Sequence, residues 1–130
     1  MMQRWARRVL MTLLTLAAIL FVTMGLRWLV NPLGIAPDLG LALQSGLGLS
    51  SQIGDFSAFF MVLGLTLLAG LVTRQSTWFY PPAVLLLIAA AGRLVAWAAH
   101  DAAFAAQMIA FEVIVALLAL AGARLAAEQT

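Results

Sequence analysis

The sequence predicts an all-α protein, a four-helix transmembrane bundle with both termini in the cytoplasm. Hydrophobic residues make up 65% of the 130-residue chain and charged residues only 9%, whereas roughly a quarter of the residues in a soluble domain are charged. Most of the surface must therefore face lipid. Four segments are apolar over the length of about 20 residues that a helix needs to cross a bilayer, and the length of the chain fits a single domain.

The first predicted span covers roughly residues 9–30 and ends at Asn31-Pro32. The basic residues before it resemble the start of a signal peptide, but the apolar run is long and no small-residue cleavage site follows it. We therefore expect a retained signal-anchor helix. The second span covers roughly residues 51–72, with Ser50 or Ser51 as its N-cap.

The third predicted span covers roughly residues 78–98 and opens with Tyr80-Pro81-Pro82. Prolines fit the first turn of a helix, because backbone N–H groups there have no intrahelical acceptor. The fourth span covers roughly residues 102–126. Helix boundaries read from sequence carry an error of a few residues.

The only long connection covers residues 31–50. Its pattern is too short and too rich in glycine to cross a membrane. It predicts a short interfacial helix begun at Pro37-Asp38, or a lid over the outer mouth of the bundle. An ordered loop lying on the lipid headgroups explains the pattern equally well.

The arginines orient the bundle. Five of them fall on one side of a four-span arrangement, and the opposite loops, residues 31–50 and 99–101, contain no Lys or Arg; the five are Arg4, Arg7, Arg8, Arg74 and Arg124. By the positive-inside rule, both termini are cytoplasmic. Aromatic residues agree with this orientation, since Trp5, Trp78 and Tyr80 would mark the inner interface and Trp28 and Trp97 the outer one.

Arg93 and Glu112 each lie within an apolar run, which is the most informative feature of the chain. An ionisable group in hydrocarbon normally faces a protein interior or a wet cavity and has a partner. A lone charge in mid-span costs about 2.5–3.5 kcal/mol on the insertion scale, whereas each Leu or Val contributes only about 0.3–0.6 kcal/mol in favour of insertion. Pairing of the two charges is therefore expected.

Helix rise places the other membrane-embedded charges in the same outer half of the bilayer. We expect Arg93 to pair with Glu112 and Asp55, and Arg27 to pair with Asp55 or Asp101. Together these residues form the predicted polar cluster, which comprises Arg93, Glu112, Asp55, Arg27, His100 and Asp101.

Three functions remain open for the predicted polar cluster. The favoured interpretation is that it fixes helix order in a structural or partner-binding membrane protein. It can line a cavity, open to the outside, that binds or transports a small molecule or a lipid headgroup. It can serve a proton relay or hydrolytic chemistry, which is the least supported, because His100 and Asp101 are adjacent on a loop and no activated serine accompanies them.

Several kinds of function have no signal in this chain. One histidine with scattered carboxylates lacks the spacing of a metal site, and the absence of cysteine excludes disulfides and thiol redox chemistry. No catalytic residue, metal or cofactor is assigned. The net charge of +2 reflects orientation in the membrane, not a nucleic-acid surface, because basic residues do not form a stripe interleaved with aromatics. The expected partners are the lipid bilayer and either another membrane protein or a second copy.

The order of short motifs resembles a small bacterial membrane family, domain of unknown function 4345. The motifs extend over nearly the whole chain and are Asn31-Pro32, Ser51 to Phe56 (SQIGDF), Thr73-Arg74, Ala91-Gly92-Arg93 and Phe111-Glu112. The resemblance implies a multi-pass, four-helix protein of the bacterial inner membrane, similar in style to DoxX-like bundles. It implies no activity. Some members carry a phage-infection label, which suggests an envelope component that a phage exploits.

Overall fold

The structure is a computed structural model that describes residues 3–128. All regular structure in this range is helical, as predicted. Four long helices dominate: α1 (Arg4–Val30), α3 (Gly46–Thr73), α4 (Tyr80–Ala99) and α5 (Ala106–Glu128). The short elements are α2 (Pro32–Ile35) and the 3₁₀ turns η1 (Ala36–Leu39) and η2 (Ser76–Phe79).

Four helical segments are long and apolar enough to cross a membrane. They are α1, α3, the combined segment Ser76–Ala99 and α5. The predicted number of spans is therefore confirmed by length and composition. Of the segment expected to act as a signal anchor, residues 1 and 2 lie outside the described residues, and α1 runs without interruption from Arg4.

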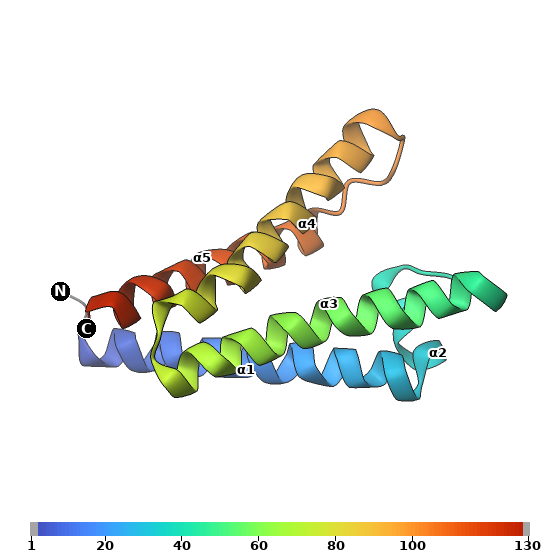
Figure 1. The fold of residues 1–130 in the computed structure, drawn as a ribbon. Helices are drawn as coiled ribbons and strands as arrows, with labels where there is room; N and C mark the ends of the chain where they lie inside the picture. The colour runs from blue at the N-terminus through green and yellow to red at the C-terminus, as the bar shows by residue number, and fades with distance from the viewer. Residues whose placement is uncertain (1–2, 129–130) are drawn as a thin grey trace.

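The long helices form two hairpins that diverge (Figure 1). Helix α1 lies along α3, and α4 lies along α5. The start of α1, the end of α5 and the turn between α3 and α4 are together at one end of the molecule, which we call the terminal end. The connection from α1 to α3 and the loop between α4 and α5 are at the opposite end, the loop end, where the hairpins separate.

The hairpins join near the terminal end, around Phe79 of η2. This side chain is only 1% exposed. Two glycines make room for its ring: a Cβ added to Gly70 of α3 would lie 2.8 Å from it, and one added to Gly122 of α5 would lie 3.1 Å from it. Small residues let apolar helices approach closely, so these glycines allow η2 to pack against both α3 and α5.

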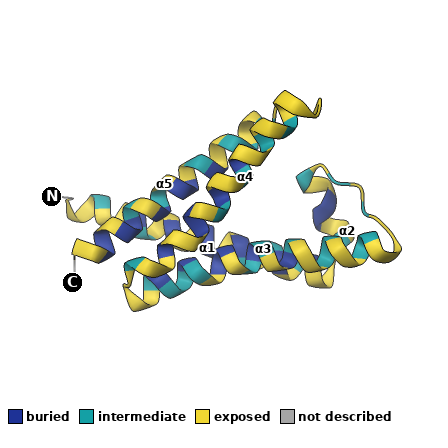
Figure 2. Cartoon of the chain, turned by 45° about the horizontal axis from the view of Figure 1, so that its top comes forward, coloured by how far each residue is buried: buried dark blue, intermediate teal, exposed yellow. Residues whose placement is uncertain are grey.

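Aromatic contacts continue the core toward the loop end. Phe21 of α1 stacks on Phe60 of α3 with ring centroids 6.3 Å apart, and meets Phe111 of α5 edge to face at 6.0 Å. Trp28 is fully buried and stacks on Phe56 at 4.9 Å. Figure 2 shows that the buried residues gather where the hairpins meet, whereas the loop end of α4 is mostly exposed.

The second long helix begins earlier than predicted. Helix α3 starts at Gly46, so Ser50 and Ser51 lie inside the helix and neither is its N-cap. Ser45 occupies the N-cap position and makes no side-chain capping bond. Instead, the side chain of Gln52 fixes the preceding loop: its Oε1 accepts from the backbone N–H of Gln44 at 2.8 Å, and its Nε2 donates to the carbonyl of Ala42 at 3.0 Å.

The fourth long helix begins later than predicted, at Ala106 instead of residue 102. Asp101 has a left-handed backbone with φ of 57°. This conformation turns the chain, and the N–H of Ala102 donates to the carbonyl of Ala96 at 3.1 Å, closing the end of α4. Residues 102–105 therefore belong to the loop.

The connection between α1 and α3, residues 31–45, folds onto the bundle. The 3₁₀ turn η1 contains Pro37 and Asp38, so the short helix expected there exists in a tighter form. Ile35 and Ala36 are buried, with relative exposures of 0% and 1%. The connection therefore packs against the protein through these two residues.

Candidate functional site

Arg93 and Glu112 form an ion pair between α4 and α5, and this part of the predicted pairing is confirmed. The Nε of Arg93 donates to Oε1 of Glu112 at 2.8 Å. The Glu112 side chain is 8% exposed and that of Arg93 is 37% exposed. Each residue lies six positions from the loop-end terminus of its helix, which is about 9 Å at 1.5 Å per residue, so the two residues meet at the same depth.

Two cavities adjoin this ion pair, between the diverging hairpins. The first has a volume of about 320 Å³ and the second about 440 Å³. Both are lined by Arg93 and Glu112, and both share further walls formed by Leu39, Phe59 and Phe60. We call the two cavities together the inter-hairpin groove. Volumes of 300–1,000 Å³ with mostly apolar walls and a few polar groups are typical of ligand pockets.

Each of the two cavities also has walls that the other does not share. The smaller cavity adds residues of α1, η1 and α5, among them Phe21, Asp38 and Phe111. The larger cavity adds Asp55 and Phe56 of α3 and Ala89 of α4. The groove therefore takes residues from all four long helices and from the connection that folds over them.

The ion pair with Glu112 engages only one of the three guanidinium nitrogens of Arg93. Arginine has five N–H donors, and in the described part of the chain the only acceptor for Arg93 is Glu112, bonded through Nε. Both terminal nitrogens therefore lack a partner there. They can donate to an oxygen of a molecule in the groove, and such charge-assisted hydrogen bonds are stronger than neutral ones.

Asp55 lies in the groove but does not pair with Arg93, so that part of the prediction is wrong. Its side chain is exposed and lines the larger cavity together with Arg93 and Glu112. The hairpins diverge at this level (Figure 1), which separates α3 from the Arg93–Glu112 pair on α4 and α5. Asp55 can therefore accept a hydrogen bond from a bound molecule.

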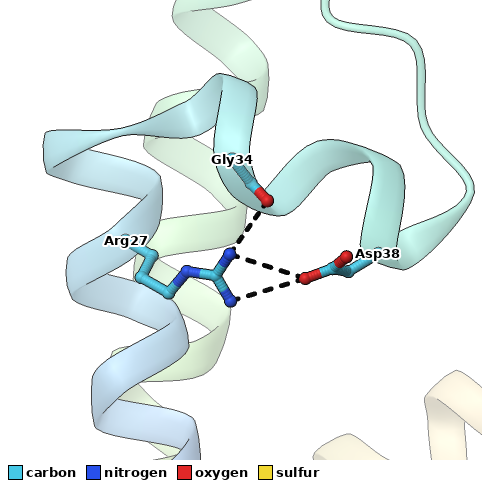
Figure 3. Close-up of polar contacts among 3 residues, drawn as sticks. All are labelled: Arg27, Gly34 and Asp38. Atoms are coloured by element: carbon cyan, nitrogen blue, oxygen red, sulfur yellow. Dashed lines mark hydrogen bonds and ion pairs between the residues drawn. The ribbon is translucent and has the colours of Figure 1, made fainter.

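Arg27 pairs with Asp38, not with Asp55 or Asp101 as predicted. Both terminal nitrogens of Arg27 lie 3.5 Å from Oδ2 of Asp38, and one donates to the carbonyl of Gly34 at 2.9 Å (Figure 3). The connection after α1 turns back on the helix and brings Asp38 to Arg27. Asp38 is close to Arg27 in sequence and takes the place of the predicted partners Asp55 and Asp101. The contact also holds η1 beside the groove.

His100 and Asp101 do not belong to the site. Both are exposed at the loop end, His100 as the C-cap of α4 and Asp101 in the loop that follows. Neither lines either cavity of the inter-hairpin groove. Within residues 3–128, no group of three or more His, Cys, Asp or Glu side chains could hold a metal ion.

Sequence reasoning missed the apolar walls and the role of Asp38. Phe60 and Phe111 have the pattern of ordinary residues of apolar helices, because in such a composition nothing separates a cavity wall from a lipid contact. A signal for Asp38 was present, since it stands at the Pro37-Asp38 start of the predicted short helix and is the only charged residue between 31 and 50.

Comparison of the chain with protein-family models, curated proteins and solved structures finds no match.

Proposed function

We propose that this chain is a four-span protein of the bacterial inner membrane, with both termini cytoplasmic, that binds an amphipathic ligand in the inter-hairpin groove. One observation carries the binding proposal. Arg93 is fixed through Nε by a buried carboxylate, its terminal nitrogens have no partner among the described residues, and it lines both cavities of the groove. The cellular location rests on the arginine distribution and the family resemblance given above.

The polar groups of the groove favour a zwitterionic headgroup. Arg93 offers donors for a phosphate or carboxylate oxygen, and Asp55 offers an acceptor for an amine or hydroxyl. The charge of Asp38 is already compensated by Arg27. A ligand with an anionic oxygen and an ammonium group would satisfy both free sites, as phosphatidylethanolamine would.

The aromatic walls favour an apolar chain on the same ligand. Phe59 and Phe60 line both cavities, Phe56 lines the larger one, and Phe111 lines the smaller one. Burial of apolar surface contributes about 25 cal/mol per Å². An acyl chain would therefore stabilise the complex along the same walls that hold the headgroup near Arg93.

A purely structural role explains the ion pair less well. The pair joins α4 to α5, two helices that already lie side by side as one hairpin. It does not connect this hairpin to α1 and α3. The pair therefore does not itself hold the two hairpins together. Both of its residues do line the two cavities of the inter-hairpin groove.

Binding can be tested by native mass spectrometry of the purified protein titrated with phosphatidylethanolamine. Arg93→Lys keeps a positive charge beside Glu112 but removes the terminal guanidinium donors. A hydrogen bond to a charged group contributes about 1.5–3 kcal/mol, so we expect affinity to fall by roughly tenfold or more. Arg124→Lys, on an exposed arginine of the terminal end, is the matched control and should bind as wild type does.

A second variant tests the headgroup assignment. Asp55→Asn should reduce the preference for phosphatidylethanolamine over phosphatidylcholine, since the choline headgroup has no N–H donor. Equal binding by wild type and Arg93→Lys, or no saturable binding by the wild type, would contradict the proposal.

A further inference from the structure

A third cavity lies at the terminal end, far from the inter-hairpin groove along the helices. Its volume is about 330 Å³, and it is bordered by α1, α3, η2 and α5. Two arginines from different helices contribute to it, Arg7 of α1 and Arg74 at the end of α3. Among the described residues, no acidic one lines it. We call it the terminal-end cavity.

The rest of the terminal-end cavity is largely apolar. Met11, Leu71, Phe79 and Leu125 form its walls, and Gly70 and Gly122 contribute no side chain. The hydroxyl of Thr15 donates to the carbonyl of Met11 at 2.7 Å, so this polar group is already satisfied. The cavity thus combines an apolar interior with two positive charges.

Neither arginine forms an ion pair with another residue in the range 3–128. The ion pairs found among residues 3–128 are Arg27–Asp38 and Arg93–Glu112. The side chains of Arg7 and Arg74 are therefore unpaired in the described chain, and both residues are exposed. Two unpaired guanidinium groups beside one apolar cavity are complementary to an amphiphile with an anionic headgroup.

Exposed tryptophan and tyrosine side chains lie at the same end of the bundle as this cavity. Trp5, Trp78 and Tyr80 are exposed at the same end of the bundle, with relative exposures of 66%, 39% and 49%. Tryptophan and tyrosine are enriched where a bilayer meets water. An amphiphile held here would place its headgroup among these residues and its chain along the apolar walls.

We infer that the terminal-end cavity is a specific site for an anionic phospholipid of the inner leaflet. The phosphate is held by Arg7 and Arg74, and one acyl chain packs against Met11, Leu71 and Leu125. The ligand differs from that of the inter-hairpin groove in charge and in leaflet. The inference rests on the proposed membrane orientation, which the topology experiment in the Discussion tests separately.

The backbone of Arg74 supplies a favourable test variant. Arg74 adopts a left-handed conformation with φ of 59° as the C-cap of α3, a position that glycine occupies more readily than other residues. Arg74→Gly should therefore remove the charge without disturbing the helix end. We combine it with Arg7→Ala, and use Arg8→Ala with Arg124→Ala as a control that removes the same charge from exposed arginines outside the cavity.

The experiment measures retention of phosphatidylglycerol by native mass spectrometry, with phosphatidylcholine as the uncharged competitor. Each hydrogen bond from Arg7 or Arg74 to the bound phosphate is expected to contribute about fivefold to binding, whereas Arg8 and Arg124 do not line the cavity and make no such bond. The Arg7→Ala/Arg74→Gly variant should thus bind phosphatidylglycerol roughly 25-fold more weakly than wild type, while the control double variant stays within about twofold.

Equal loss in both double variants would overturn the inference, because it would show a general charge effect and not a site. Equal binding of phosphatidylglycerol and phosphatidylcholine by the wild type would also overturn it. If the double variant does not purify as a monodisperse helical protein, Arg74→Gly alone provides the comparison, with an expected loss of about fivefold. Binding of phosphatidylethanolamine at the inter-hairpin groove should be unaffected by these variants, so failure of one site does not imply failure of the other.

Discussion

Arg93 and Glu112 lie nineteen residues apart in sequence and meet through a 2.8 Å bond between Nε and Oε1. The glutamate is buried and the arginine is partly accessible. If the bond is broken, the arginine can still be hydrated, whereas the glutamate is left as a buried charge without a partner. The two residues therefore have different roles. Glu112 holds Arg93 in place, and the terminal nitrogens of Arg93, which have no partner in residues 3–128, lie beside the inter-hairpin groove.

Breaking this pair should destabilise the protein, and the effect should depend on which partner is removed. Arg93→Leu leaves a buried carboxylate without its donor, which costs about 3–5 kcal/mol for a fully buried pair and less here because Arg93 is partly exposed. Glu112→Gln keeps an acceptor oxygen and should cost only about 1–3 kcal/mol. Thermal unfolding in detergent, monitored by circular dichroism, measures both.

The double variant Arg93→Leu/Glu112→Leu should recover part of the lost stability, because no charge is then left unpaired. A double variant as unstable as the worse single variant would contradict direct pairing.

Packing around Phe79 gives a second prediction. In Gly70→Ala the new Cβ would lie 2.8 Å from two atoms of the Phe79 ring, so the ring or the helix must move. Overpacking of this kind costs about 1–3 kcal/mol, and the unfolding temperature should fall. Gly92→Ala is the control, since a Cβ at that helical position has no atom within 4 Å; it should unfold no earlier than wild type. Equal effects of the two changes would show that the close packing at Phe79 is unimportant.

The Arg27–Asp38 ion pair should help to hold η1 over the inter-hairpin groove, and this effect can be measured. Leu39 lines both cavities and follows Asp38 directly. The natural chain has no cysteine, so Leu39→Cys would carry a unique thiol. Adding Arg27→Gln removes the ion pair, and we expect faster reaction of this thiol with a water-soluble maleimide. Exposed ion pairs contribute at most about 1 kcal/mol, so the acceleration should be modest, up to about fivefold.

A thiol at Leu33 provides the reference for that measurement. Leu33 is 67% exposed and lies outside both cavities, so Arg27→Gln should not change the labelling rate of Leu33→Cys. If both thiols accelerate together, the whole connection has loosened and η1 is not a separate cover.

Topology is tested with single cysteines at the two ends of the bundle. Gln75→Cys lies in the turn between α3 and α4, at the terminal end, and Ala103→Cys lies in the loop between α4 and α5. With cytoplasmic termini, a membrane-impermeant maleimide added to intact spheroplasts should label Ala103→Cys only. Gln75→Cys should react after permeabilisation. The reverse pattern would invert the orientation and move the terminal-end cavity to the other leaflet.

The sequence was most informative where a single physical rule dominated. Hydrophobicity determines the number of long helices, and the cost of an unpaired charge in an apolar helix pointed to the Arg93–Glu112 contact. It was least informative where two partners compete. Arg27 had several carboxylates within reach, and the choice of Asp38 depends on the path of the connection after α1, which short-range patterns do not determine.

The divergence of the hairpins was also beyond sequence reasoning. A compact bundle would have brought Asp55 to Arg93, and the predicted pairing assumed one. The close packing of Phe79 against Gly70 and Gly122 joins the hairpins near the terminal end, and the Phe21–Phe111 contact joins them farther along. A glycine in an apolar helix does not reveal which side chain will approach it, so the groove, and with it most of the candidate site, follows from tertiary packing.

The divergence gives the molecule a wedge-like outline, narrow at the terminal end and broad at the loop end (Figure 1). In a bilayer, such a body takes up more area in one leaflet than in the other. Lipids in the wider half must either fill the gap between the hairpins or accept a local bend of the membrane. Occupancy of the groove would thus couple the shape of this small protein to the curvature of the membrane around it.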